Sequence, residues 1–271
     1  MKAVAEIKIG GKPAGIALSP DKSKAYITAP DGQELVEVDA HKREVSRRLK
    51  LGGGPLGIAV HPTNGEVYVA DWYFHKISVV ETKELKAVAE IAVGQSPSGL
   101  AVSPDGRFLI SADRDSDQIS IVDIATRTVA ATVATGKRPF GVTISAGGTR
   151  AYTANVASDD VTVIDLNTRK AAGTIKAGHR PYAIAFAQGL GFSTDQGVGT
   201  VTVFDPSRLT AVKTIEACDH PEGIEASNDG MAVFVACWGD NVLLQLDART
   251  FEITGKAATG DGPRAFGAFL R

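Results

Sequence analysis

Cysteine is scarce in this sequence, and long apolar runs are missing. The 271 residues include two cysteines, Cys218 and Cys237, which excludes a small fold held together by several disulfides. No stretch approaches the ~20 consecutive apolar residues that a membrane helix needs, so we expect no membrane span. The first residues, MKAVAEIKIGG, lack the apolar segment of a signal peptide. The formal net charge of −2 argues against a general nucleic-acid-binding protein, and we expect no nucleic-acid partner.

Motifs of common enzymes are also absent. The chain contains neither the GxSxG motif of serine hydrolases nor the HExxH motif of zinc metalloproteases. No segment sustains the apolar periodicity of an amphipathic helix, which argues against a helical fold. We therefore assign no catalytic residue and favour a protein that is not an enzyme, while leaving activity open.

The sequence does contain a repeat. Proline returns every 42 residues, with one step of 40, at Pro13, Pro55, Pro97, Pro139, Pro181, Pro221 and Pro263. An acidic residue closes a short apolar run in each of six copies, at Asp39, Glu81, Asp123, Asp165, Asp205 and Asp247. A fixed period of this length is typical of repeat architectures. Because the repeat runs from end to end, we predict one domain over residues 1–271.

Each repeat reads as four short strands. In the second copy, the segments PLGIAVHP, EVYVADW, KISVVET and LKAVAEIAVGQ are rich in Val and Ile and are separated by turn residues. The hairpin SPDG at residues 103–106 has proline early and glycine late, as tight turns require. Four antiparallel strands in about 40 residues form one blade of a β-propeller. The predicted fold class is therefore all-β, a propeller of four-stranded blades.

The repeat also resembles a known family. PSGLAVSPDG at residues 97–106, AYTAN at 151–155 and VTVID at 161–165 are similar to the YVTN family of bacterial and archaeal β-propellers. The resemblance covers nearly the whole chain and implies a propeller without common catalytic residues. Since many members resemble exported or surface proteins, it favours a periplasmic or extracellular location. Related propellers include lactonases and proteins that handle tetrapyrroles.

The two ends of the chain carry further strand-like segments. Residues 3–9 resemble an outer strand and residues 264–270 an inner strand, beside six complete four-strand units. Propellers remove open sheet edges by closing into a ring, normally with strands from both termini in one blade. We predict six complete blades and a reduced seventh formed from the N- and C-terminal strands, with a closed six-blade ring as the alternative.

One face of the predicted ring varies from copy to copy. The segments before each proline and the loops between the second and third strands meet there, at the mouth of the central channel. Arginine in such a place favours carboxylate or phosphate, and exposed aromatic residues are typical of recognition surfaces. The alternatives are solvated arginines around a watery channel and tryptophans that only pack between blades. The predicted ligand-binding residues are Lys12, Trp72, Tyr73, His75, Arg114, Arg138, Arg180, His220, Glu222, Trp238 and Arg264.

The two cysteines lie on this same face in adjacent predicted blades. A disulfide between Cys218 and Cys237 requires Cα atoms within ~7 Å of each other. Free buried thiols are a second interpretation. A metal site from Cys218, His220 and Cys237 is a third, although no CxxC pair is present. Apart from the divalent metal of this third interpretation, we predict no cofactor.

Two functions stay open on the sequence. The favoured one is a monomeric, non-catalytic binding or scaffold propeller that recognises a small anionic molecule or a protein partner through the variable face. The alternative is a lactonase- or lyase-like propeller enzyme with a polar channel site, in which His220 beside Glu222 serves as a base.

Overall fold

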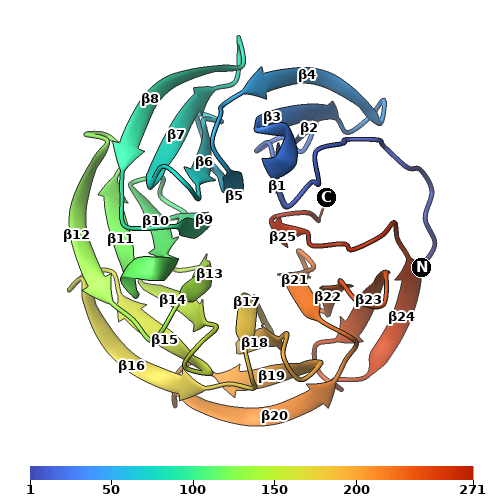
Figure 1. Cartoon of the computed structure of the whole chain (residues 1–271). Helices are drawn as coiled ribbons and strands as arrows, with labels where there is room; N and C mark the ends of the chain where they lie inside the picture. The colour runs from blue at the N-terminus through green and yellow to red at the C-terminus, as the bar shows by residue number, and fades with distance from the viewer. Residues whose placement is uncertain (271) are drawn as a thin grey trace.

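The computed structural model describes residues 1–270 and confirms the all-β propeller. Six four-stranded antiparallel blades surround a central channel, and each blade runs from its innermost strand outward (Figure 1). Blades 1 to 3 comprise β1 (Gly15–Leu18), β2 (Lys24–Ala29), β3 (Glu34–Asp39), β4 (Glu44–Lys50), β5 (Pro55–Val60), β6 (Val67–Asp71), β7 (Lys76–Glu81), β8 (Lys86–Ala92), β9 (Pro97–Val102), β10 (Phe108–Asp113), β11 (Gln118–Asp123) and β12 (Thr128–Ala134). Blades 4 to 6 comprise β13 (Pro139–Ile144), β14 (Arg150–Asn155), β15 (Asp160–Asp165), β16 (Lys170–Lys176), β17 (Pro181–Ala187), β18 (Leu190–Asp195), β19 (Thr200–Asp205), β20 (Thr210–Glu216), β21 (Pro221–Ala226), β22 (Ala232–Cys237), β23 (Val242–Asp247) and β24 (Ile253–Ala258).

The recurring residues have local structural roles. Five of the innermost strands begin at a recurring proline. Because proline has no backbone N–H to donate to a neighbouring strand, it suits the first position of a strand. The acidic residue after each third strand accepts hydrogen bonds from the backbone of the following turn. Asp39, for example, accepts from the backbone N–H groups of His41 and Lys42 at 2.9 and 2.8 Å. These hydrogen bonds hold the pKa of Asp39 below its ordinary value.

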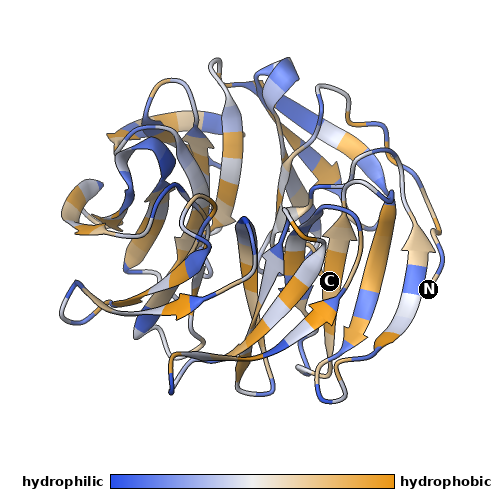
Figure 2. Ribbon diagram, turned by 60° about the horizontal axis from the view of Figure 1, so that its bottom comes forward, coloured by the Kyte–Doolittle hydropathy of each residue, from blue (hydrophilic) through white to orange (hydrophobic). Residues whose placement is uncertain are grey.

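The core lies between neighbouring blades. The middle strands are rich in apolar residues, as Figure 2 shows by hydropathy, and blades 2 to 5 bury both faces of these strands. One interface contains an acid: Glu37 on β3 accepts from Arg47 Nε at 3.0 Å, Lys24 Nζ at 3.1 Å and Ser46 Oγ at 2.8 Å. Burial alone would raise the pKa of Glu37, but these donors hold it below its ordinary value.

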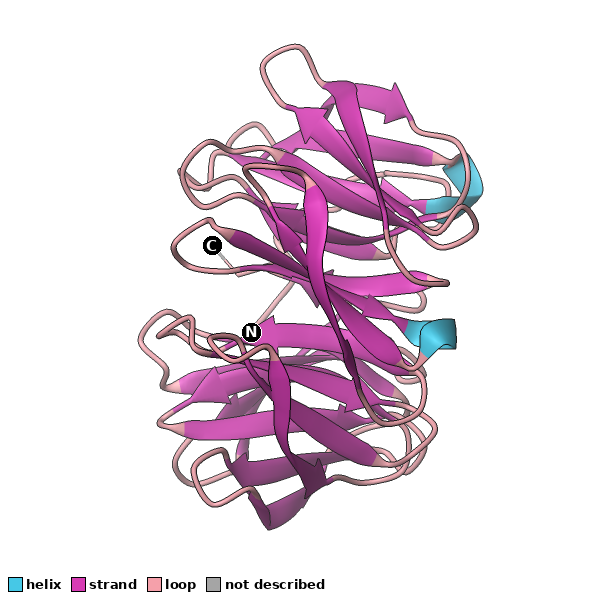
Figure 3. Ribbon diagram, turned by 90° about the vertical axis from the view of Figure 1, so that its left-hand side faces the viewer, coloured by secondary structure: helices cyan, strands magenta, loops and turns pink. Residues whose placement is uncertain are grey.

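The two faces of the ring differ in their loops. Figure 3 shows the short 3-10 helices η1 (Pro30–Gly32) and η2 (Arg114–Ser116) on one and the same face. Both belong to loops between second and third strands, which share this face with the segments that precede the recurring prolines. None of the helices within residues 1–270 is long and apolar enough to cross a membrane.

The predicted reduced seventh blade is not found. Residues 1–10 form no strand, and the short strand β25 (Phe266–Gly267) pairs in parallel with β1, through Gly15↔Phe266 and Ile16↔Gly267. The sector between β24 and β4 is crossed only by the two terminal segments (Figure 1). Without the two middle strands of a blade, an inner and an outer strand lie too far apart to share a ladder, because neighbouring strands must lie about 5 Å apart.

Candidate functional site

A cavity of about 990 Å³ opens on the face that carries the pre-proline segments. Its floor is formed by residues that directly follow the recurring prolines, and its rim by the loops between second and third strands. The members of the predicted site that line it are Lys12, Trp72, Tyr73, Trp238 and Arg264. Residues that the prediction did not include also line it, among them Leu56, Phe140, Tyr182, Ile27 and Asp31.

The wall of the cavity contains a continuous aromatic stack. The ring centroids of Trp72 and Phe140 lie 6.2 Å apart, and those of Phe140 and Tyr182 lie 4.2 Å apart. The guanidinium of Arg114 lies 5.3 Å from the Trp72 ring, a cation–π contact. Trp72 comes from the loop after β6 in blade 2, whereas Phe140 and Tyr182 occupy equivalent positions at the starts of β13 and β17 in the neighbouring blades 4 and 5. A flat ligand therefore has an aromatic surface to lie against.

A buried carboxylate stands next to Tyr182 in the ring of post-proline residues. Glu222 is 2% exposed, and its Oε1 accepts from Gln196 Nε2 at 2.7 Å. Its Oε2 has no hydrogen-bond partner among residues 1–270, and Arg264 Nε lies 3.9 Å away. Burial raises the pKa of Glu222, and the nearby Arg264 offsets this only in part. The group is thus a buried acid with unused acceptor capacity, close to one cation of the cavity.

Backbone conformation at the cavity mouth is unusual. Lys12, Ser96, Arg138, Arg180 and His220 each precede a recurring proline and have φ between 49° and 57°. Non-glycine residues rarely adopt this left-handed conformation, but it recurs on the opposite face, in the turns that contain Arg43, Leu85, Arg127, Arg169, Leu209 and Phe251, so it belongs to the repeat.

Three of the predicted arginines, Arg114, Arg138 and Arg180, do not line the cavity. The backbone N–H groups of Arg138 and Arg180 donate to Asp117 and Asp159 of the preceding blades, at 2.8 and 3.0 Å. The Arg138 side chain is 56% exposed and lies 4.0 Å from Asp115. The predicted ring of arginines around the channel therefore contributes Arg264 to the cavity wall, but neither Arg138 nor Arg180.

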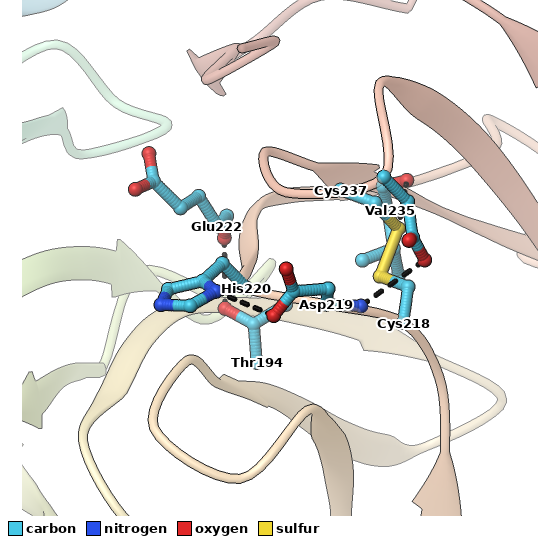
Figure 4. Close-up of a disulfide and its surroundings, with 8 residues drawn as sticks. Thr194, Cys218, Asp219, His220, Glu222, Val235 and Cys237 are labelled. Atoms are coloured by element: carbon cyan, nitrogen blue, oxygen red, sulfur yellow. Dashed lines mark hydrogen bonds and ion pairs between the residues drawn. A yellow bond between two sulfur atoms is a disulfide. The ribbon is translucent and has the colours of Figure 1, made fainter.

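The two predicted histidines also lie outside the cavity lining. His75 Nδ1 accepts from the backbone N–H of Ser96 at 3.1 Å, which ties two loops together. His220 Nδ1 lies 2.6 Å from Asp219 Oδ1 (Figure 4). The His220 ring packs edge-on against Trp238, with centroids 5.6 Å apart. His220 therefore packs against Trp238 at the rim, and among the described residues no hydrogen bond joins it to the Glu222 carboxylate.

A disulfide joins the two cysteines beside this rim (Figure 4). Cys218 follows the outer strand β20 of blade 5, Cys237 ends β22 of blade 6, and their Cα atoms lie 6.0 Å apart. Because the sulfurs are bonded to each other, neither is a thiolate for the metal site of Cys218, His220 and Cys237. Within residues 1–270, no three His, Cys, Asp or Glu side chains gather closely enough to hold a metal ion.

Comparison with known proteins identifies the family. A family model described as "Lactonase, 7-bladed beta-propeller" matches residues 41–179. The chain belongs to this family. The YVTN name inferred from the repeat stays a prediction. This lactonase-family propeller has six complete blades, whereas the family description gives seven.

Solved structures share the fold of this lactonase-family propeller. Hydrazine synthase of Kuenenia stuttgartiensis aligns over 97% of this chain and 91% of its own, with a TM-score of 0.85 and 19% identity. A functionally unknown protein of Desulfotomaculum acetoxidans aligns over 96% and 91%, with a TM-score of 0.79 and 14% identity. No curated protein matches the sequence. At these identities the likeness concerns the fold alone.

Proposed function

We propose that this propeller is a non-catalytic binding protein that takes a small organic anion with a flat, apolar body. The observation that supports this most is the aromatic stack of Trp72, Phe140 and Tyr182 in one wall of a cavity of about 990 Å³. Ligand cavities of ~300–1,000 Å³ with mostly apolar walls and a few polar groups are typical of small-molecule sites.

The charge of the ligand follows from Arg264. Its side chain is 39% exposed, and its nearest carboxylate, Glu222, lies 3.9 Å away, beyond hydrogen-bond distance. Lys12, the other cation in the lining, already pairs with Asp31 at 2.9 Å. Arg264 is therefore the cation we expect to bind a carboxylate or sulfonate.

The test uses the intrinsic fluorescence of the protein. Both tryptophans, Trp72 and Trp238, line the cavity, so a quenching titration reports on this site. The probes are 2-naphthoate and its neutral analogue 2-naphthamide. We expect Arg264→Gln to weaken 2-naphthoate binding about tenfold, as loss of a charge-assisted hydrogen bond does, and to leave 2-naphthamide unchanged.

A matched control separates the site from surface charge. Arg208 is 81% exposed in the turn after β19, on the opposite face, so Arg208→Gln should bind both probes as the native protein does. Equal affinity for the two probes, or no quenching up to about 1 mM, would contradict the anion site.

Lactone hydrolysis is the second candidate, and two observations favour it. The family model carries the lactonase description, and Glu222 is a buried acid with a raised pKa next to the cavity. A panel of γ- and δ-lactones, assayed with and without added divalent metal, tests it. Hydrolysis that Glu222→Gln abolishes would support an enzyme, whereas hydrolysis equal in native protein and variant would exclude this role for Glu222.

A protein partner is the other form that binding can take. Tyr73 and Phe74, in the loop beside the cavity, are 68% and 61% exposed, and exposed aromatic residues are enriched in recognition surfaces. Substituting Phe74 by serine should leave naphthoate affinity unchanged, since Phe74 does not line the cavity, but should weaken a protein complex that uses this rim.

A further inference from the structure

The sequence contains the same hexapeptide in two different environments. Residues 2–7 and residues 86–91 both read KAVAEI. The second copy forms most of β8 and pairs with β7, with Ile91 opposite Ile77 and 3% exposed. The first copy makes no backbone-to-backbone hydrogen bond among the described residues, and Ile7 is half-buried. The same sequence is a strand where a neighbouring strand exists and is unpaired where none does.

The wall of blade 6 that faces the seventh sector is also incompletely covered. Phe234 and Leu243 are half-buried. The residues at the position of Phe234 in blades 1 to 5 are at most 2% exposed: Tyr26, Tyr68, Ile110, Tyr152 and Phe192. Those at the position of Leu243 are 0% exposed: Leu35, Ile77, Ile119, Val161 and Val201. In blades 1 to 5 the residues at these two positions pack against the next blade. In blade 6, Phe234 and Leu243 face the seventh sector instead.

On the opposite wall, blade 1 presents an apolar surface. Ala25, Val36 and Val38 are buried there, and Ile7 and Ile9 of the N-terminal segment pack against them. Elsewhere in the ring this surface packs against the middle strands of the preceding blade. The two walls are therefore the two halves of an ordinary blade–blade interface, separated by a sector that holds only β25 and the unpaired residues 1–10.

We propose that this sector binds a two-stranded β-hairpin of a partner polypeptide, which takes the place of the two middle strands of a seventh blade. One strand of the hairpin pairs with residues 2–7, as β7 pairs with β8, and its apolar side chains cover Phe234 and Leu243. This is binding by strand addition, in which backbone hydrogen bonds supply affinity and alternate side chains supply specificity.

Two other occupants fit the sector less well than a partner hairpin does. A small apolar molecule can cover Phe234 but offers no ladder to residues 2–7. A second copy of this chain carries its hairpins inside its own blades throughout residues 1–270. The polar Gln245 stands next to Phe234 in the wall, paired with it across β22 and β23. The partner hairpin therefore alternates apolar residues and places a hydrogen-bonding side chain against Gln245.

The experiment uses a synthetic peptide with the sequence of residues 150–165, the hairpin β14–β15, as the probe. We expect it to bind the full chain and to slow hydrogen exchange of the amides of residues 2–8, while a scrambled peptide does neither. Phe234→Ala should weaken binding about tenfold or more, as loss of an aromatic anchor does. Val212→Ala, on the 52% exposed Val212 of the outer strand β20, is the matched control and should bind as the native chain does.

Three results would overturn the proposal. The first is unchanged exchange of residues 2–8 at peptide concentrations up to about 1 mM. The second is equal binding of the scrambled peptide, a comparison that needs no variant to fold. The third is a dimer of the peptide-free chain by analytical ultracentrifugation in which residues 2–8 are already protected, because the occupant would then be a second copy.

Discussion

The disulfide between Cys218 and Cys237 allows the most quantitative prediction. It closes a loop with a sequence separation of 19 residues. In the chain-entropy model, a loop of this length lowers the entropy of the unfolded chain enough to stabilise the fold by about 3 kcal/mol. For a chain of this size, each kcal/mol shifts the melting temperature by roughly 2 °C. Replacing both cysteines by serine should therefore lower the melting temperature by about 6 °C.

Calorimetry and hydrogen exchange test this prediction together. The double variant Cys218→Ser/Cys237→Ser and the native chain are melted with and without dithiothreitol. Reduction should lower the melting temperature of the native chain to that of the variant and leave the variant unchanged. Because the bond links blade 5 to blade 6, the amides around Trp238 should exchange faster in the reduced protein.

Two melting results would contradict stabilisation of the fold by closure of this loop. A melting temperature that changes by less than about 1 °C in the double variant would show that the unfolded chain gains little freedom when the bond is lost. A native chain that is insensitive to dithiothreitol, while the double variant melts lower, would mean that the serine substitutions act through packing at the buried position of Cys237 rather than through the bond.

Three further predictions concern the blades. Burial raises the pKa of Asp195 from 3.8 to about 6, so the charge of Asp195 destabilises the fold increasingly as the pH rises through this range. Asp195→Asn copies Asn155 in blade 4. In urea unfolding it should stabilise the chain by up to about 3 kcal/mol at pH 8 and not at all near pH 3.5. A Cβ on Gly191 would lie 2.1 Å from the Phe204 ring, so Gly191→Ala should cost about 1–3 kcal/mol, and Phe204→Val in the same chain should recover part of the loss. Glu37→Gln removes the charge that compensates Arg47 and Lys24, and because these cations are 32% and 40% exposed it should cost about 1–2 kcal/mol in the same assay, whereas unchanged stability would mean that water replaces the carboxylate fully.

The repeat predicts the ring and its orientation well because each repeat carries its own strand and turn chemistry. Pro139 and Pro181 are expected at the start of inner strands and are found there. Whether the terminal segments form strands depends on the neighbours that they find in the folded chain, which alternation of residues cannot reveal. Residues 2–7 show this directly, since an identical hexapeptide at residues 86–91 does form a strand.

The sequence predicts a site at the mouth of the channel, but two of its arginines stand two positions before residues that line the cavity. Arg138 and Arg180 were expected at the channel, yet the residues that line it are Phe140 and Tyr182, directly after the prolines. The residue before each proline has its N–H tied to an acid of the preceding blade, at Asp117 for Arg138, and this contact fixes where its side chain leaves the chain. Arg138 and Arg180 also have φ of 55° and 57°, so the chain is not extended at these residues, and their side chains leave it in another direction than those of Phe140 and Tyr182. The residues directly after the recurring prolines include two aromatic ones, Phe140 and Tyr182, and this pattern is the sequence signal that identifies the cavity wall.

The cavity and the seventh sector share one segment of the chain. Ile9, Gly260, Asp261 and Arg264 line the cavity, and they flank the unpaired residues 2–7 and the strand β25. A hairpin that orders these flanks would also fix Arg264, the cation expected to hold the anion, so each ligand should bind more tightly in the presence of the other. Thermodynamic linkage makes this coupling reciprocal: the factor by which the 150–165 peptide raises naphthoate affinity must equal the factor by which naphthoate raises peptide affinity. Arg264→Gln should remove the coupling while leaving peptide binding itself in place, which distinguishes a shared segment from two independent sites.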